Sequence, residues 1–106
     1  MPLTTLWPMS ILHDTKTYLG LMEDDTAFDS EVKDAIDNAL ATATQLNREV
    51  GDLSSEADYP ATAIGRILRQ YVNFSVRLMF DPPQTSFAIK AVEALQKEAE
   101  WRLTIQ

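Results

Sequence analysis

Cysteine is absent from this chain of 106 residues, which excludes disulfides and thiolate metal sites. Glycine occurs only three times, and no apolar run approaches the roughly 18 residues that a membrane-spanning helix needs. Residues 1–9 contain two prolines and no basic residue, so we expect no signal peptide. We therefore expect a protein that is made in the cytoplasm and does not enter a membrane.

Basic residues are also scarce: nine of them face sixteen acidic ones, a net charge of −7. This balance argues against a dedicated DNA-binding surface, because affinity for phosphates comes mostly from Lys and Arg. The charge is uneven, since residues 23–37 hold seven acids and one base, whereas residues 59–80 hold three arginines and no acid. Either these are two solvated faces, or they meet across copies of the protein. The candidates for such contacts between subunits are Asp29, Glu31, Asp34, Asp37, Arg66, Arg69 and Arg77.

Apolar residues recur at helical spacing in four segments, which predicts helices over residues 10–19, 27–46, 60–80 and 86–103. Ser10 is expected to cap the first helix and Gly20 to end it. Thr26 is expected to start the second helix, with Asp29 completing a partial capping box. Pro60 suits a first turn, with Asp58 or Tyr59 as the cap. For the last helix we expect Thr85 or Ser86 as the cap, and an inward stripe that includes Ala91, Leu95 and Leu103.

The third segment is apolar over more than half of its girth. Ile64, Leu68 and Met79 belong to its expected inward stripe, and Phe74 and Val76 lie off that stripe. Such a helix is either the centre of the domain or in contact with a second protein. The fold class predicted is all-α: a small four-helix bundle-like single domain over residues 1–106. It has an irregular N-terminal arm (residues 1–9) and a double-proline corner before the last helix.

No set of residues for catalysis accompanies these helices. His13 is the only histidine, and no serine lies in a Gly-x-Ser-x-Gly context. The acids of residues 24–31 lack the alternating ligands and central glycine of a calcium loop, and no glycine-rich phosphate loop is present. We therefore expect no enzyme activity, no metal and no cofactor.

Trp101 has two interpretations. It either closes the core at the end of the last helix or anchors an interface, since Trp and Arg are enriched at binding hot spots and Arg102 adjoins it. Glu98 and Arg102 can also pair at a spacing of four residues, which contributes only a few tenths of a kcal/mol, about 0.3.

Three stretches carry a resemblance to a known family. The first is Ser10-Ile11-Leu12 with Tyr18-Leu19-Gly20, leading to Thr26-Ala27-Phe28-Asp29; the second is Ala43-Thr44-Gln45-Leu46-Asn47. The third and most specific is Arg77-Leu78-Met79-Phe80-Asp81-Pro82-Pro83 with Glu100-Trp101-Arg102-Leu103. In this order the stretches resemble the head–tail connector (adaptor, or head-completion) proteins of tailed bacteriophages. The chain departs from that family after Leu46, where relatives often carry a Gly-Val-Gly turn and this sequence has Asn47-Arg48-Glu49-Val50-Gly51.

The resemblance implies a virion protein at the head–tail neck, made in the cytoplasm of the bacterial host. It implies a ring, expected to be dodecameric, beneath the portal protein, with a downstream neck or tail-completion protein as the next partner. Genomic DNA would pass through the ring without sequence recognition. The family's C-terminal segment commonly helps to dock onto the portal, so the candidate portal and ring contacts are Phe80, Asp81, Pro82, Pro83, Trp101, Arg102, Leu103 and Ile105.

A second hypothesis of a different class is a small acidic regulator or inhibitor that occupies a partner's basic surface. It would bind one partner stoichiometrically and form no ring. The broad apolar girth of the third helical segment disfavours it, because a free monomer should not expose a large apolar patch.

Overall fold

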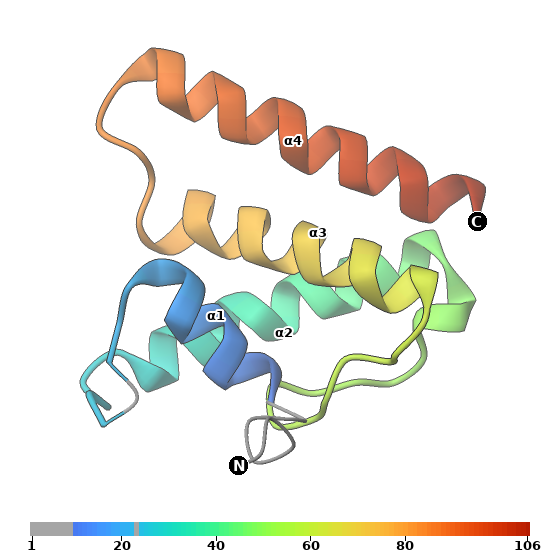
Figure 1. Ribbon diagram of the computed structural model, residues 1–106, viewed down its shortest axis with the longest axis horizontal. Helices are drawn as coiled ribbons and strands as arrows, with labels where there is room; N and C mark the ends of the chain where they lie inside the picture. Colours follow the sequence, from blue (N-terminus) through green and yellow to red (C-terminus); the bar gives the residue numbers. More distant parts are fainter. Residues whose placement is uncertain (1–9, 23) are drawn as a thin grey trace, which may run out of the picture.

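The computed structural model describes residues 10–22 and 24–106, and the expected N-terminal arm, residues 1–9, lies outside them. The described part is all-α and forms a small helical bundle, as predicted, with four α-helices and one short 3₁₀ turn (Figure 1). The elements are α1 (Ile11–Leu19), α2 (Asp29–Leu46), η2 (Arg48–Val50), α3 (Ala63–Phe80) and α4 (Ser86–Ile105).

The ends of α1 confirm both predicted caps. The Ser10 hydroxyl accepts a hydrogen bond from the His13 amide at 3.1 Å. Gly20 ends the helix at φ 82°, a left-handed conformation that glycine adopts without strain. The loop before α3 holds the start of α1 in place, because the amides of Ile11 and Leu12 donate to the carbonyls of Ala57 and Ser55.

The predicted start of α2 is wrong. The helix begins at Asp29, after Phe28, whose side chain makes no capping bond, so the Thr26–Asp29 capping box does not form. In the turn before the helix, the carboxylate of Asp25 accepts a hydrogen bond from the Ala27 amide at 3.1 Å. An Asx turn thus competes with an earlier helix start.

The predicted start of α3 is also wrong, because neither Asp58 nor Tyr59 caps it. The helix begins at Ala63, and the hydroxyl of Thr62 accepts from the Gly65 amide at 3.1 Å. Pro60 lies outside the helix, with its carbonyl against Gly65; a Cβ on Gly65 would collide with that carbonyl. This close approach explains why glycine stands in the first turn of the helix.

Helix α3 is the central helix of the bundle, which settles one of the alternatives left by its sequence. It contacts α1, α2, α4 and η2, and Leu68, Val72 and Val76 are fully buried on it. They pack with Ile11 of α1 and with the apolar stripe of α2. Met79, which was expected on the inward stripe, does not join the core and is 52% exposed.

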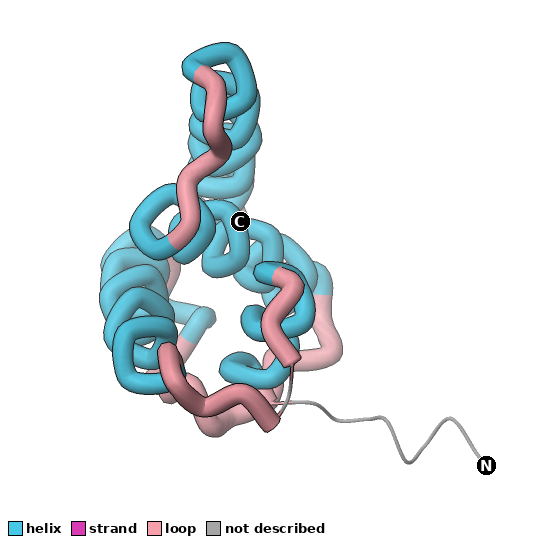
Figure 2. Tube along the Cα trace, turned by 90° about the vertical axis from the view of Figure 1, so that its left-hand side faces the viewer, coloured by secondary structure: helices cyan, strands magenta, loops and turns pink. Residues whose placement is uncertain are grey.

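Helix α4 packs chiefly on α3 and forms an outer layer over the other helices (Figures 1 and 2). Thr85 caps it, as predicted, by accepting from the Ala88 amide at 3.1 Å. Its buried residues are only Ala99 and Leu103. The predicted inward stripe is therefore too wide: Ala91 and Leu95 are exposed, because a helix that is covered mainly by one neighbour buries only a narrow strip.

Candidate interaction surface

A buried polar network fixes α1 against α3. The carboxylate of Asp14, only 4% exposed, accepts from Arg69 Nε at 2.9 and 3.0 Å and pairs with Arg69 Nη2 at 2.8 Å. Asn73 Nδ2 also donates to Asp14 at 3.3 Å, and its own carbonyl oxygen accepts from the Thr15 hydroxyl at 3.1 Å. Every partner in this network is internal, so its role is structural.

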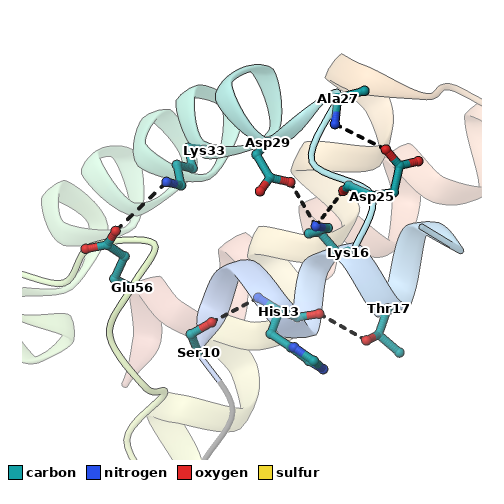
Figure 3. A network of polar contacts seen from close by, with 9 residues as sticks. All are labelled: Ser10, His13, Lys16, Thr17, Asp25, Ala27, Asp29, Lys33 and Glu56. Carbon is teal, nitrogen blue, oxygen red and sulfur yellow. Dashed lines mark hydrogen bonds and ion pairs between the residues drawn. The ribbon is translucent and has the colours of Figure 1, made fainter. Parts of the chain in front are cut away.

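Lys16 provides a second internal link, between α1 and the start of α2 (Figure 3). Its ammonium group donates to the Asp25 carbonyl at 2.7 Å and pairs with the Asp29 carboxylate at 2.9 Å. Nearby, Lys33 and Glu56 approach to 3.9 Å across an exposed edge. The loop between α1 and α2 is thus held by a buried cation at its centre.

The sequence could have indicated the Asp14 network through one signal. Ile11, Asp14, Thr15 and Tyr18 follow one another at helical spacing, so an acid lies on the inward side of a short helix. A buried acid needs a donor, and Arg69 and Asn73 are four residues apart on α3, facing it. We did not predict these partners, because pairing across elements depends on the packing of the helices.

The charged residues proposed for contacts between subunits divide into three groups. Asp29 and Arg69 are used within the chain, by Lys16 and Asp14. Arg77 is half-buried near the end of α3. The others lie exposed on the surfaces of α2 and α3 and remain available to a neighbour: Glu31, Asp34, Asp37 and Arg66.

The double-proline corner is set by the end of α3. The rings of Phe80 and Phe28 meet edge to face with centroids 5.6 Å apart, which ties the end of α3 to the start of α2. The Asp81 amide still closes the helix by donating to the Arg77 carbonyl at 3.0 Å. Asp81 and Pro82 then lie exposed and Pro83 half-buried, so the corner presents its polar and proline side chains outward.

At the C-terminal end of α4, adjacent residues face opposite ways. Leu103 is fully buried, and its carbonyl accepts from Asn47 Nδ2 at 2.9 Å, which anchors this end to η2. Trp101 is 62% exposed, so the interpretation of Trp101 as a core residue is wrong. Arg102 is exposed and pairs with Glu98 at 2.8 Å, as its spacing predicted.

The outer face of α4, opposite α3, is a largely apolar surface on which nothing packs among residues 10–22 and 24–106. Phe87 is 80% exposed and Ile105 56% exposed, at the two ends of the helix. The six residues of this face are Phe87, Ala91, Ala94, Glu98, Trp101 and Ile105, and all of them are exposed. Leu95 lies exposed at its edge. The large apolar side chains Phe87, Trp101 and Ile105 make this face a candidate for binding another protein.

Two shallow hollows flank α3. One, of about 350 Å³, lies between α2, α3 and α4 and includes Thr42, Leu78, Met79 and Gln96. Across this hollow, the side-chain amide of Gln96 on α4 donates to the Ser75 hydroxyl on α3 at 3.0 Å. The other, of about 310 Å³, lies beside Tyr18, Arg66 and Phe74. Neither is lined by a nucleophile with an adjacent base.

The pKa values of Tyr59 and Arg69 are both shifted by their surroundings. Burial raises the pKa of Tyr59, and the nearby Asp14 carboxylate raises that pKa further. The hydrogen bond from Arg69 to Asp14 raises the pKa of Arg69. Among residues 10–22 and 24–106, no group of three His, Cys, Asp or Glu side chains could hold a metal ion, and no helix could cross a membrane.

The comparison with protein families agrees with this surface-centred picture. The model of a family described as phage connector protein matches residues 11–106. The chain belongs to the phage connector protein family. No curated protein and no solved structure matches the chain.

Membership of this family suggests what the exposed surfaces of the connector are for. A phage connector is a structural component of the virion and associates with other head and tail proteins. This role needs contact surfaces rather than a catalytic pocket, and the described part of the chain offers the former. Membership therefore favours a structural role over an enzymatic one.

Proposed function

We propose that this connector forms a ring, dodecameric in the complete particle, between the portal and the tail of a tailed phage. The ring extends the DNA channel and provides the platform to which the next neck or tail-completion protein attaches. The observation that carries the proposal is the family match over residues 11–106, together with the exposed apolar face of α4.

Contacts between neighbouring subunits in a closed ring are heterologous, so each subunit needs two different complementary faces. The exposed acids of α2 (Glu31, Asp34 and Asp37) and the exposed Arg66 of α3 provide two faces of opposite sign. Arg69 and Asp29 contribute less, because both are paired inside the chain. Charge complementarity of this kind fixes register more than it adds affinity.

Docking onto the portal is assigned to the corner and the end of α4. Asp81, Pro82, Trp101, Arg102 and Ile105 are exposed there. The other three candidates are less accessible, since Phe80 and Pro83 are partly buried and Leu103 is fully buried. Tryptophan and arginine are both enriched at binding hot spots, and here they are exposed side by side.

The test is electron microscopy of lysates from a phage in which this gene is deleted. We expect free tails beside heads that lack tails or have lost their DNA, and restoration by the gene supplied in trans. Normal infectious particles would overturn the connector role and favour a small acidic regulator that binds a basic partner. A net charge of −7 is the feature that such a regulator would use.

A further inference from the structure

The outer face of α4 has the spacing of a coiled-coil seam. Its six residues are separated by steps of four, three, four, three and four, from Phe87 to Ile105. This is the alternation of a and d positions in a heptad repeat. A helix of a globular domain needs one such stripe, and α4 already buries Ala99 and Leu103 on its other side. The outer seam therefore takes no part in the apolar packing of the residues that the structure describes.

We propose that the outer face of α4 pairs with the same face of a second copy of this chain, with the two helices antiparallel. In that arrangement a positions of one helix meet d positions of the other. Centred on the seam, Phe87 meets Ile105, Ala91 meets Trp101 and Ala94 meets Glu98. The largest side chain thus lies against one of the smallest, as interdigitated packing requires.

Charge favours the antiparallel arrangement over the parallel one. Parallel helices would place Glu98 directly opposite Glu98 of the second copy, and like charges in one layer are destabilising. Antiparallel helices set the two carboxylates apart along the axis and place each against a small alanine. Each carboxylate also keeps its partner on its own helix, Arg102, at 2.8 Å.

The length of the seam predicts a weak, reversible dimer. From residue 87 to residue 105 the helix rises about 27 Å, which is fewer than three heptads, and long coiled coils extend over more. A single helix pair of this length falls at the small end of protein interfaces. Dimerisation is thus expected at roughly micromolar to submillimolar concentrations.

The pairing does not depend on the connector proposal, because it concerns the isolated protein. It also differs from the ring contact, since a face that meets itself closes a dimer around a two-fold axis and cannot by itself generate a ring. A dimer of this kind covers Trp101 and Ile105 while the subunit is free.

Sedimentation equilibrium of the purified full chain, from about 1 to about 500 µM, tests the pairing. We expect a monomer–dimer equilibrium that A94E weakens at least about tenfold, because it inserts a second charge into the seam. E98L should strengthen it by removing the central charge. E93A changes an exposed α4 residue outside the seam and should leave the constant unchanged. Circular dichroism of each variant checks that the fold is intact.

Orientation is tested with engineered cysteines, since the chain has none of its own. Mixed A94C and E98C chains should form disulfide-linked heterodimers faster than either variant alone forms homodimers. Faster linking of A94C chains to one another would overturn the antiparallel pairing. A protein that stays monomeric over the whole range would overturn the self-association, as would an oligomer that A94E leaves unchanged; the gene-deletion phenotype would be unaffected by either result.

Discussion

Asp14 places a carboxylate in the interior of a small domain, where Arg69 and Asn73 donate hydrogen bonds to it. Because its side chain is 5% exposed, removing the arginine would leave it without its main partner. A fully buried pair broken in this way costs about 3–5 kcal/mol. The Arg69 side chain is 52% exposed, so the carboxylate can recover part of its hydration.

We therefore expect Arg69→Ala to lower the free energy of unfolding by about 2 kcal/mol. The matched control is Arg66→Ala, one turn away on the same helix and exposed, with an expected change within about 0.5 kcal/mol. Urea denaturation of both variants measures this. Equal effects of the two substitutions would show that the network contributes nothing specific to stability.

Tyr59 makes a prediction for alkaline pH. Its pKa is raised in the folded protein above the ordinary 10.0, mainly by burial. Below pH 10 both the folded and the unfolded state keep the phenolic proton, so the ionisation of Tyr59 does not reduce the free energy of unfolding there. Above pH 10 the unfolded state loses the proton while the folded state retains it, and stability falls, at most by about 1.4 kcal/mol per pH unit.

The Tyr59→Phe variant removes this dependence while keeping the ring. Unfolding free energies of the two proteins should run parallel up to pH 10 and diverge above it, with the variant less sensitive to alkali. Tyr71, whose pKa burial also raises, contributes equally to both proteins and cancels in the difference. Curves that stay parallel to pH 11 would contradict the assignment to Tyr59.

At the scale of elements, the first turn of α3 gives an unusual expectation. Alanine is normally the better helix residue by about 1 kcal/mol. Gly65→Ala should nevertheless destabilise the protein, by about 2 kcal/mol, because the new methyl group collides with the Pro60 carbonyl. The exposed Gln70→Ala on the same helix serves as control. Thermal unfolding would contradict the assignment if Gly65→Ala raised the Tm.

Two residues near the C-terminal end of α4 have different roles: Leu103 packs in the core, and Trp101 is a candidate for binding. Leu103 is fully buried, so Leu103→Ala should cost about 2–4 kcal/mol of unfolding free energy. Trp101, which is mostly exposed, should cost under about 1 kcal/mol when changed to alanine. Urea denaturation below the concentration of dimerisation measures both. A larger loss from Trp101→Ala would mean that the indole supports the fold.

At the scale of the whole molecule, the exposed Trp101 can be tested for binding in the assembled virion. In complementation of a gene-deleted phage, Trp101→Ala should reduce the yield of infectious particles by at least about tenfold, since an interface tryptophan commonly contributes 2 kcal/mol or more. Glu93→Ala, exposed on the same helix, should leave the yield unchanged. Soluble protein levels of both variants control for folding. Equal yields would remove the C-terminal end of α4 from the proposed portal contact.

The local sequence determined the class of the fold and most helix ends. Apolar spacing identified four helices, and Ser10, Gly20 and Thr85 cap them as expected. Caps of this kind depend on a few neighbouring residues, so they can be read locally. The starts of α2 and α3 were missed because nearby side chains are equally suitable for capping: Asp25 accepts from the Ala27 amide, and Thr62 accepts from the Gly65 amide.

The sequence by itself thus established an acidic, all-α chain, and its motifs led to the connector family. Only the tertiary structure decided which residues are buried. Periodicity alone could not separate the two sides of α4, because both carry apolar residues at helical spacing. The choice was made by α3, which covers the side with Leu103 and leaves Trp101 outside. A residue's exposure depends on what packs against its helix, and that neighbour lies far away in the chain.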